Sequence, residues 1–340
     1  MCKNIDALQK RAKRKFINNP VLIHLIDLNS PLKDKYLSSL SCSSLVKQQA
    51  DNKITSKYCK RPWCTICAPI RTAVRINNYS KCLSELKDLQ LTTLTIPNVP
   101  DYEIKSSVQH FRKIFKQFRD SFNKKTGLVF KGVYNFEITY NAKTTLFHPH
   151  IHIIHEGLEV LNIQQRDGTI KKTNSLINYW LKNEKTAKIV AQDSRPCTDL
   201  IEGFKYTSKS VYSKRIDGKK EIVVPVKQLD KMYQQLVGVR CFQPFGIKAQ
   251  SVEQEDKQMD NLTAYELQKP VGSYLWKHHD WFMHHLVDID TGEILQDYEV
   301  RENTAIIQIP LSDYKPSLQV EKLHEKLTLN KNYHNEIEPY

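Results

Sequence analysis

The sequence predicts an α+β protein in which an antiparallel sheet is packed against helices. Runs that alternate in polarity or are rich in β-branched residues occur at 91–97, 132–140, 148–154 and 188–193 and are typical of strands. Segments between them carry apolar residues at three- and four-residue steps, the pattern of amphipathic helices. With 340 residues, the chain is long enough for about two domains with a core.

Charge is distributed unevenly along the chain. Basic and acidic residues number 25 and 9 in residues 1–131, 18 and 11 in 132–249, and 8 and 17 in 250–340. The first two thirds therefore suit a polyanion such as DNA. We expect a basic N-terminal segment over 1–90, a central domain over 91–249, and an acidic, partly flexible region over 250–340. No run of about 18 apolar residues occurs, so we expect a cytoplasmic protein without a membrane span.

Four cysteines in the N-terminal segment have the spacing of metal ligands. Cys64 and Cys67 form a CxxC pair, Cys59 lies five residues before it, and Cys42 lies 17 residues before Cys59. Four thiolates make a closed tetrahedral zinc site. Buried free thiols and a redox pair are the alternatives, although no βαβ pattern surrounds the pair. The basic residues beside this cluster that we expect to contact DNA are Arg61, Arg71 and Arg75.

Three elements precede the central strands. A helix is predicted over 70–89 and a strand over 91–99, which Pro97 and Asn98 terminate. A second helix is predicted over 101–125. Its apolar residues form one stripe, which we interpret as core: Ile104, Val108, Phe111, Phe115, Phe118 and Phe122. Lysines and arginines occupy the rest of this helix, and either a DNA contact or a solvated face explains them.

The run FHPHIHIIH at 147–155 contains the most informative residues. Side chains alternate faces along a strand, so His150 and His152 point the same way and can bind one divalent metal ion. The strand over 132–140 forms a hairpin with this run, which makes Glu137 a natural third ligand. The alternatives are half-exposed histidines and a solvent-facing glutamate. His148 has the same parity and is a candidate substrate contact, whereas His155 is off this face.

Further helices are predicted over 173–183, 199–212 and 227–236. In the second of these, Asp199 is a plausible N-cap, and Glu202, Tyr206 and Lys209 share one face, flanked by Lys205. An exposed Glu–Lys pair is the simpler reading of this face. Combined with a metal site and a basic surround, however, the residues suit attack of a tyrosine on a phosphodiester, which would leave a 5′-phosphotyrosine. A hydrolase with metal-activated water would need no tyrosine.

Three motifs in this order resemble the HUH endonucleases, and among them the rolling-circle replication initiators of small bacterial plasmids. LTTLTIPNV resembles their first motif, HPHIHII the metal-binding motif, and KYTSK the tyrosine motif. Cys59-KRPW-Cys64-TI-Cys67 resembles the cysteine cluster that precedes the first motif in one branch. The resemblance runs from Cys42 to Gly246, about 60% of the chain.

The resemblance implies an HUH fold, with a central antiparallel sheet of about five strands and flanking helices. It implies Mg²⁺ or Mn²⁺ at His150 and His152, whereas imidazole ligands alone would suggest zinc or another transition metal. Tyr206 would be the nucleophile, with Tyr212 a weaker rival. Glu202 stands where two-tyrosine members have a second tyrosine, and would activate water for the final cleavage. The implied partners are single-stranded or hairpin DNA at a plasmid origin, a host helicase and other replication proteins.

Two other functions remain open at this point. An HUH transposase shares the nicking chemistry and often has an N-terminal zinc module. A non-enzymatic zinc protein that binds DNA as a regulator suits the basic N-terminal third, but it leaves Glu137, His150, His152 and Tyr206 without a role.

Overall fold

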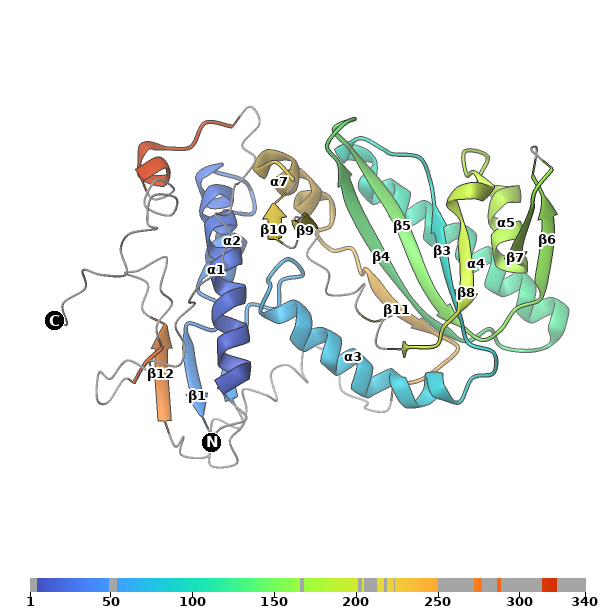
Figure 1. Ribbon diagram of the computed structural model, residues 1–340, viewed down its shortest axis with the longest axis horizontal. Coiled ribbons are helices and arrows are strands. Elements are labelled where there is room, and N and C mark those ends of the chain that lie inside the picture. Colours follow the sequence, from blue (N-terminus) through green and yellow to red (C-terminus); the bar gives the residue numbers. More distant parts are fainter. Residues whose placement is uncertain are drawn as a thin grey trace. The chain divides into compact units, whose positions relative to one another are not determined.

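The strands predicted around the histidine run pair into one antiparallel sheet of five strands in a computed structural model of the chain (Figure 1). The structure describes residues 5–48, 54–165, 168–200, 204, 213–216, 219–222, 224–249, 272–276, 286–288 and 314–322. None of the helices in these ranges has the length and apolar character needed to cross a membrane.

The chain divides into two compact units, which are described separately. We call Arg71–Val211 with Lys231–Gln254 the sheet unit. The cysteine unit consists of Met1–Ile70, Tyr212–Asp230 and Glu255–Tyr340. The domain ranges expected from the sequence remain a prediction.

The sheet of the sheet unit has the strand order β11-β4-β5-β3-β8, and every adjacent pair is antiparallel. In chain order its strands are β3 (Gln90–Thr95), β4 (Gly132–Asn141), β5 (Leu146–His155), β8 (Asp193–Pro196) and β11 (Phe242–Phe245). The α+β class with a five-stranded antiparallel sheet is therefore confirmed. The hairpin expected between the strand at 132–140 and the histidine run is β4 paired with β5.

One face of this sheet packs against two helices (Figure 1). The turn η1 (Asp101–Glu103) leads into α4 (Ile104–Thr126), and α5 (Ser175–Asn183) follows later. Phe111 of α4 stacks on Trp180 of α5 at 4.7 Å and contacts Phe136 of β4 edge-on at 5.8 Å. The predicted aromatic stripe is thus core. Because side chains alternate along β4 and β5, Glu137, His150 and His152 lie on the opposite face.

The strand predicted over 188–193 is wrong in its position. Residues Ile189–Ala191 form a 3-10 turn, η2, and the strand β8 begins only at Asp193. The buried side chain of Gln192 explains the turn: its Oε1 accepts a hydrogen bond from the backbone N–H of Thr95 at 2.8 Å, and its Nε2 donates to the Lys188 carbonyl at 2.9 Å. The Gln192 side chain thus bonds to the backbone of Thr95 where the backbone of a neighbouring strand would otherwise pair with β3.

A two-stranded ribbon, β6 (Val160–Gln164) with β7 (Ile170–Asn174), precedes α5. The helix expected from residue 173 starts at Ser175 because Asn174 caps it, its Oδ1 accepting from the N–H of Ile177 at 3.0 Å. Likewise, the helix expected over 70–89 is α3 (Cys67–Ser84), and that expected over 227–236 is α7 (Val226–Gln235).

The cysteine unit contains α1 (Ile5–Asp27), α2 (Lys33–Leu40) and a sheet of order β13-β12-β1-β2. The strands of that sheet are β1 (Leu45–Gln48), β2 (Ile54–Ser56), β12 (Gly272–Trp276) and β13 (Leu286–Asp288). A second hairpin pairs β9 (Ser213–Ile216) with β10 (Lys219–Ile222). Leu22, Leu25 and Tyr36 are buried at 1% exposure or less, so this N-terminal region has a core of its own.

His155 lies on the helix-covered face of the main sheet and is fully buried. Its Nε2 is hydrogen-bonded to Thr92 Oγ1 at 2.8 Å, and its Nδ1 donates to the Glu156 carbonyl at 2.7 Å. Burial disfavours the charged imidazolium and lowers the pKa of His155 from 6.5 to about 4. His155 therefore lies off the face of His150 and His152, as the alternation of side chains along the strand predicts.

This histidine makes the stability of the protein fall in acid. The unfolded chain takes up a proton near pH 6.5 and the folded chain only near pH 4, so stability is complete above pH 6.5 and is lost as the pH falls. For this group alone, the free energy of unfolding should decrease by about 2.5 kcal/mol between pH 7 and pH 4.5. Urea unfolding at the two pH values should show that His155→Gln lacks this part of the decrease. Equal decreases in both proteins would contradict the prediction.

Candidate functional site

Three buried side chains from β4 and β5 meet on the face of the main sheet opposite α4 and α5. Glu137 pairs directly with His150 across the two strands, and His152 follows two residues along β5. Glu137 Oε2 lies 2.8 Å from His150 Nε2 and 3.0 Å from His152 Nε2. The three residues are 6–8% exposed, and one donor atom of each lies within 4.8 Å of the others. This group could hold a metal ion.

The second ring nitrogen of each histidine is held by a neighbour. His152 Nδ1 is hydrogen-bonded to Thr93 Oγ1 of β3 at 2.9 Å, and His150 Nδ1 to the His148 carbonyl at 3.2 Å. Both rings therefore turn Nε2 toward Glu137. Metal-binding histidines generally use their other ring nitrogen in this way, which fixes the orientation of the ring. The donor set and its outer partners thus fit a divalent ion with two nitrogen ligands and one oxygen ligand.

The remaining histidine of this face is half-buried. The His148 ring lies 5.3 Å from that of His150. Partial burial, and then the nearby His150, lower the pKa of His148. A neutral imidazole beside the metal ligands can donate or accept a hydrogen bond; that His148 contacts a substrate stays a prediction.

An apolar cluster covers the same face beside the three ligands. Its buried members come from α3, from the sheet and from residue 204: Tyr79, Leu83, Leu91, Val133, Ile154, Phe204 and Phe242. Phe204 is helical, 1% exposed, and lies 6.1 Å from the Phe242 ring. A small pocket next to the cluster is lined by Asn135, His152 and Phe204 among others. Phe204 therefore lies beside His152 of the candidate metal site.

Four residues expected to be catalytic, Glu202, Lys205, Tyr206 and Lys209, lie outside the described residues. Of the helix predicted over 199–212, Asp199, Leu200 and Phe204 are described; Leu200 and Phe204 are helical, and Asp199 directly precedes Leu200.

The four N-terminal cysteines come together in the cysteine unit. Cys67 Sγ lies 3.5 Å from Cys42 Sγ and 3.7 Å from Cys59 Sγ, and all four sulfurs lie within 4.8 Å of one another. Zinc–sulfur bonds of about 2.3 Å in a tetrahedron place the sulfurs about 3.8 Å apart. The cluster could therefore hold zinc, and Cys42, the ligand from the longest loop, is part of it.

Backbone and side-chain donors surround this cluster. The N–H of Cys59 donates to Cys42 Sγ at 3.4 Å, and the N–H of Lys60 donates to Cys67 Sγ at 3.3 Å. Lys15 of α1 is 1% exposed, and its Nζ donates to the Cys42 carbonyl at 2.6 Å. A buried ammonium beside four thiolates offsets part of their negative charge. Sequence reasoning missed Lys15, because a lysine in a basic helix is usually solvated.

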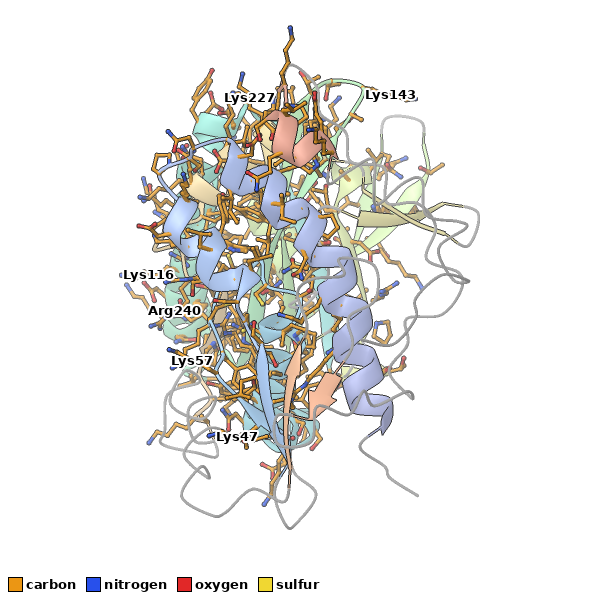
Figure 2. The ribbon with its side chains drawn as sticks, turned by 90° about the vertical axis from the view of Figure 1, so that its left-hand side faces the viewer. Lys47, Lys57, Lys116, Lys143, Lys227 and Arg240 are labelled. Atoms are coloured by element: carbon orange, nitrogen blue, oxygen red, sulfur yellow. The ribbon has the colours of Figure 1, made fainter. Side chains whose placement is uncertain are left out.

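The three arginines expected to contact DNA are all partly exposed. The Arg75 guanidinium lies 4.3 Å from the centre of the Phe242 ring, so Arg75 also packs against β11. Elsewhere in the sheet unit, Figure 2 shows Lys116 and Arg240 reaching outward, and both are exposed. Arg112, one turn before Lys116 on α4, donates to the Arg240 carbonyl. Basic side chains of α4 and of Arg240, which lies just before β11, thus share one side of the sheet unit.

Comparison with known proteins finds a relative. A curated protein of Staphylococcus aureus named Protein rep is 28% identical to this chain over 165 residues, which is 45% of this chain and 69% of that protein. No family model matches the sequence. No solved structure matches it.

Zinc in the cysteine cluster should stabilise the protein. Purified protein should contain one equivalent of zinc by elemental analysis, and Cys64→Ser, which removes a fully buried ligand, should lose it. A loss of about 4 kcal/mol would lower the melting temperature by roughly 10 °C. Cys82→Ser, outside the cluster, should keep both the metal and the melting temperature. One equivalent of zinc retained in Cys64→Ser would disprove the site.

Proposed function

We propose that this chain is an HUH-type enzyme that nicks one DNA strand at a plasmid origin and so initiates rolling-circle replication. The observation that carries the proposal is the meeting of the Glu137 carboxylate with the Nε2 atoms of His150 and His152. A non-enzymatic regulator would not need this buried constellation. The similarity to a protein named rep supports a role in replication over one in transposition.

The proposed metal ion is Mg²⁺ or Mn²⁺, held by Glu137, His150 and His152. Bound there, it would polarise the scissile phosphate and stabilise the charge that develops on its oxygens. The chain itself orients the ligands through Thr93 and the His148 carbonyl. Burial of the three ligands keeps water from competing for them, and His148 would contact the phosphate or a neighbouring base.

Tyr206 is the proposed nucleophile. Its phenol oxygen would attack phosphorus in line, the bond to the 3′ oxygen would break, and the leaving oxygen would take a proton to become a 3′-hydroxyl. The product is a 5′-phosphotyrosine that retains the phosphodiester energy for rejoining. Lys205 and Lys209 would bind the phosphate or lower the pKa of the phenol. Phe204, the nearest described residue in sequence, lines a pocket together with His152, which supports a nucleophile from this part of the chain.

Glu202 is the proposed general base for the last step. A second tyrosine would allow repeated strand transfer, whereas a carboxylate that activates water hydrolyses the final phosphodiester and stops the reaction. Zinc at the four cysteines would have a structural role. Arg61, Arg71 and Arg75 would bind DNA phosphates, and the partners would be origin DNA, a host helicase and replication proteins.

Replacing the nucleophile should remove the covalent intermediate. With Mn²⁺ and a single-stranded origin oligonucleotide, the wild-type protein should form a protein–DNA adduct that survives a denaturing gel. Tyr206→Phe lacks the attacking oxygen and should reduce the adduct to background. Tyr212→Phe is the matched control and should form it normally. An adduct that persists in Tyr206→Phe but disappears in Tyr212→Phe would transfer the role to Tyr212.

Loss of the base should separate initiation from termination. Glu202→Ala retains Tyr206 and should make the first nick at a near-normal rate. Without an activated water it should fail to terminate, so plasmid replication in cells should yield products longer than one unit length. Glu202→Asp keeps a carboxylate and should recover part of the termination. Unit-length products from Glu202→Ala would exclude the proposed role.

A further inference from the structure

The outer face of the ribbon formed by β6 and β7 has no role in the proposed nicking reaction. Residues paired across antiparallel strands point to the same side, and Asn162 pairs with Lys172 while Gln164 pairs with Ile170. All four side chains are exposed. Within the described part of the chain, none of the four makes a side-chain hydrogen bond or an ion pair. Their polar groups are therefore available to a partner.

This set has the chemistry that reads base pairs. Asn and Gln side chains form paired hydrogen bonds with adenine, lysine bonds with guanine, and aliphatic groups contact the thymine methyl. Ile170 is 68% exposed, so its aliphatic group can reach a partner. A two-stranded ribbon also has the width that the major groove of DNA admits.

Spacing and charge agree with this chemistry. Asn162 and Gln164 are two residues apart on one strand, which separates them by about 6.7 Å. Two base-pair steps of about 3.4 Å cover the same distance. The surrounding stretch of chain, residues 160–196, has seven basic and three acidic residues, and so complements a polyanion.

The ribbon is fixed to the sheet that bears the metal ligands, through Lys171 on its other face and through Asn174 at its end. Lys171 Nζ donates to the carbonyl of Gln192 at 2.6 Å and to that of Ile189 at 3.0 Å. Asn174 Nδ2 donates to Thr92 Oγ1 at 2.9 Å, and Thr92 is bonded in turn to His155 of β5. Figure 1 shows the ribbon beside α5, on the opposite side of the unit from β11. It therefore stands at a fixed offset from the candidate metal site.

We propose that the outer face of β6 and β7 reads duplex DNA in the major groove, such as the stem beside a nick site, through Asn162, Gln164, Lys172 and Ile170. The proposal rests on the proposed function and adds to it the element that selects the sequence. A sequence read by the ribbon would hold the nick site at a set distance from Glu137, His150 and His152.

Selection from a random-sequence duplex library tests the proposal directly. The wild-type protein should enrich one motif, with adenine at two positions separated by a single base pair. Asn162→Ala with Gln164→Ala should lose the preference at those two positions, and its affinity for the selected duplex should fall at least about 10-fold. Its affinity for a scrambled duplex should not change, because no charge is removed. An unchanged melting temperature shows that the variant is folded.

Gln109→Ala with Gln117→Ala removes two exposed amides from α4 and is the matched control. It should select the same motif as the wild type. An unchanged motif in the ribbon variant, or no motif enriched by the wild type, would overturn the proposal. Failure of the wild type to form the phosphotyrosine adduct would instead overturn the nicking assignment, so the two proposals fail separately.

Discussion

The register in which β4 pairs with β5 is the constraint on which the rest of the site depends. It sets Glu137 opposite His150 and leaves His152 on the same face. A shift by one residue would turn these polar groups toward α4 and move Phe136 and Ile151 out of the core. The packing of Phe136 and Ile151 against the helices on one face therefore fixes the positions of Glu137, His150 and His152 on the other face. Thr93 of β3 then orients His152, so three neighbouring strands define the donor positions.

Much of this arrangement follows from the sequence because its signals are local. The two-residue period of a strand is enough to place His150 and His152 together and to send His155 to the other face. The CxxC spacing of Cys64 and Cys67 predicts a cluster in the same way. The steps between aromatic residues predict α4, and the structure places that stripe against β4. Each of these inferences needs only the geometry of a single element and a partner close in sequence.

Other features depend on partners that are distant along the chain, and these features could not be predicted from local sequence patterns. Gln192 occupies a backbone pairing position beside Thr95, which converts an expected strand into a turn. Lys15 is buried through a hydrogen bond to Cys42, although its surroundings in the sequence indicate a solvated helix. The β6–β7 ribbon begins in a run without clear alternation and ends at Asn174, whose capping role depends on where α5 starts.

The pairing of β11 with β4 has a consequence for how the protein is made. Phe242 pairs with Asn135, and the Phe136 N–H donates to the Cys241 carbonyl, roughly one hundred residues later in the chain. The β4–β5 hairpin needs only contacts that are local in the sequence, so it can form before β11 has been translated. Until residue 245 has been translated, the outer edge of β4, beside Glu137, exposes unpaired backbone groups that recruit other strands. A chain that ends within this interval therefore keeps an unpaired sheet edge beside Glu137.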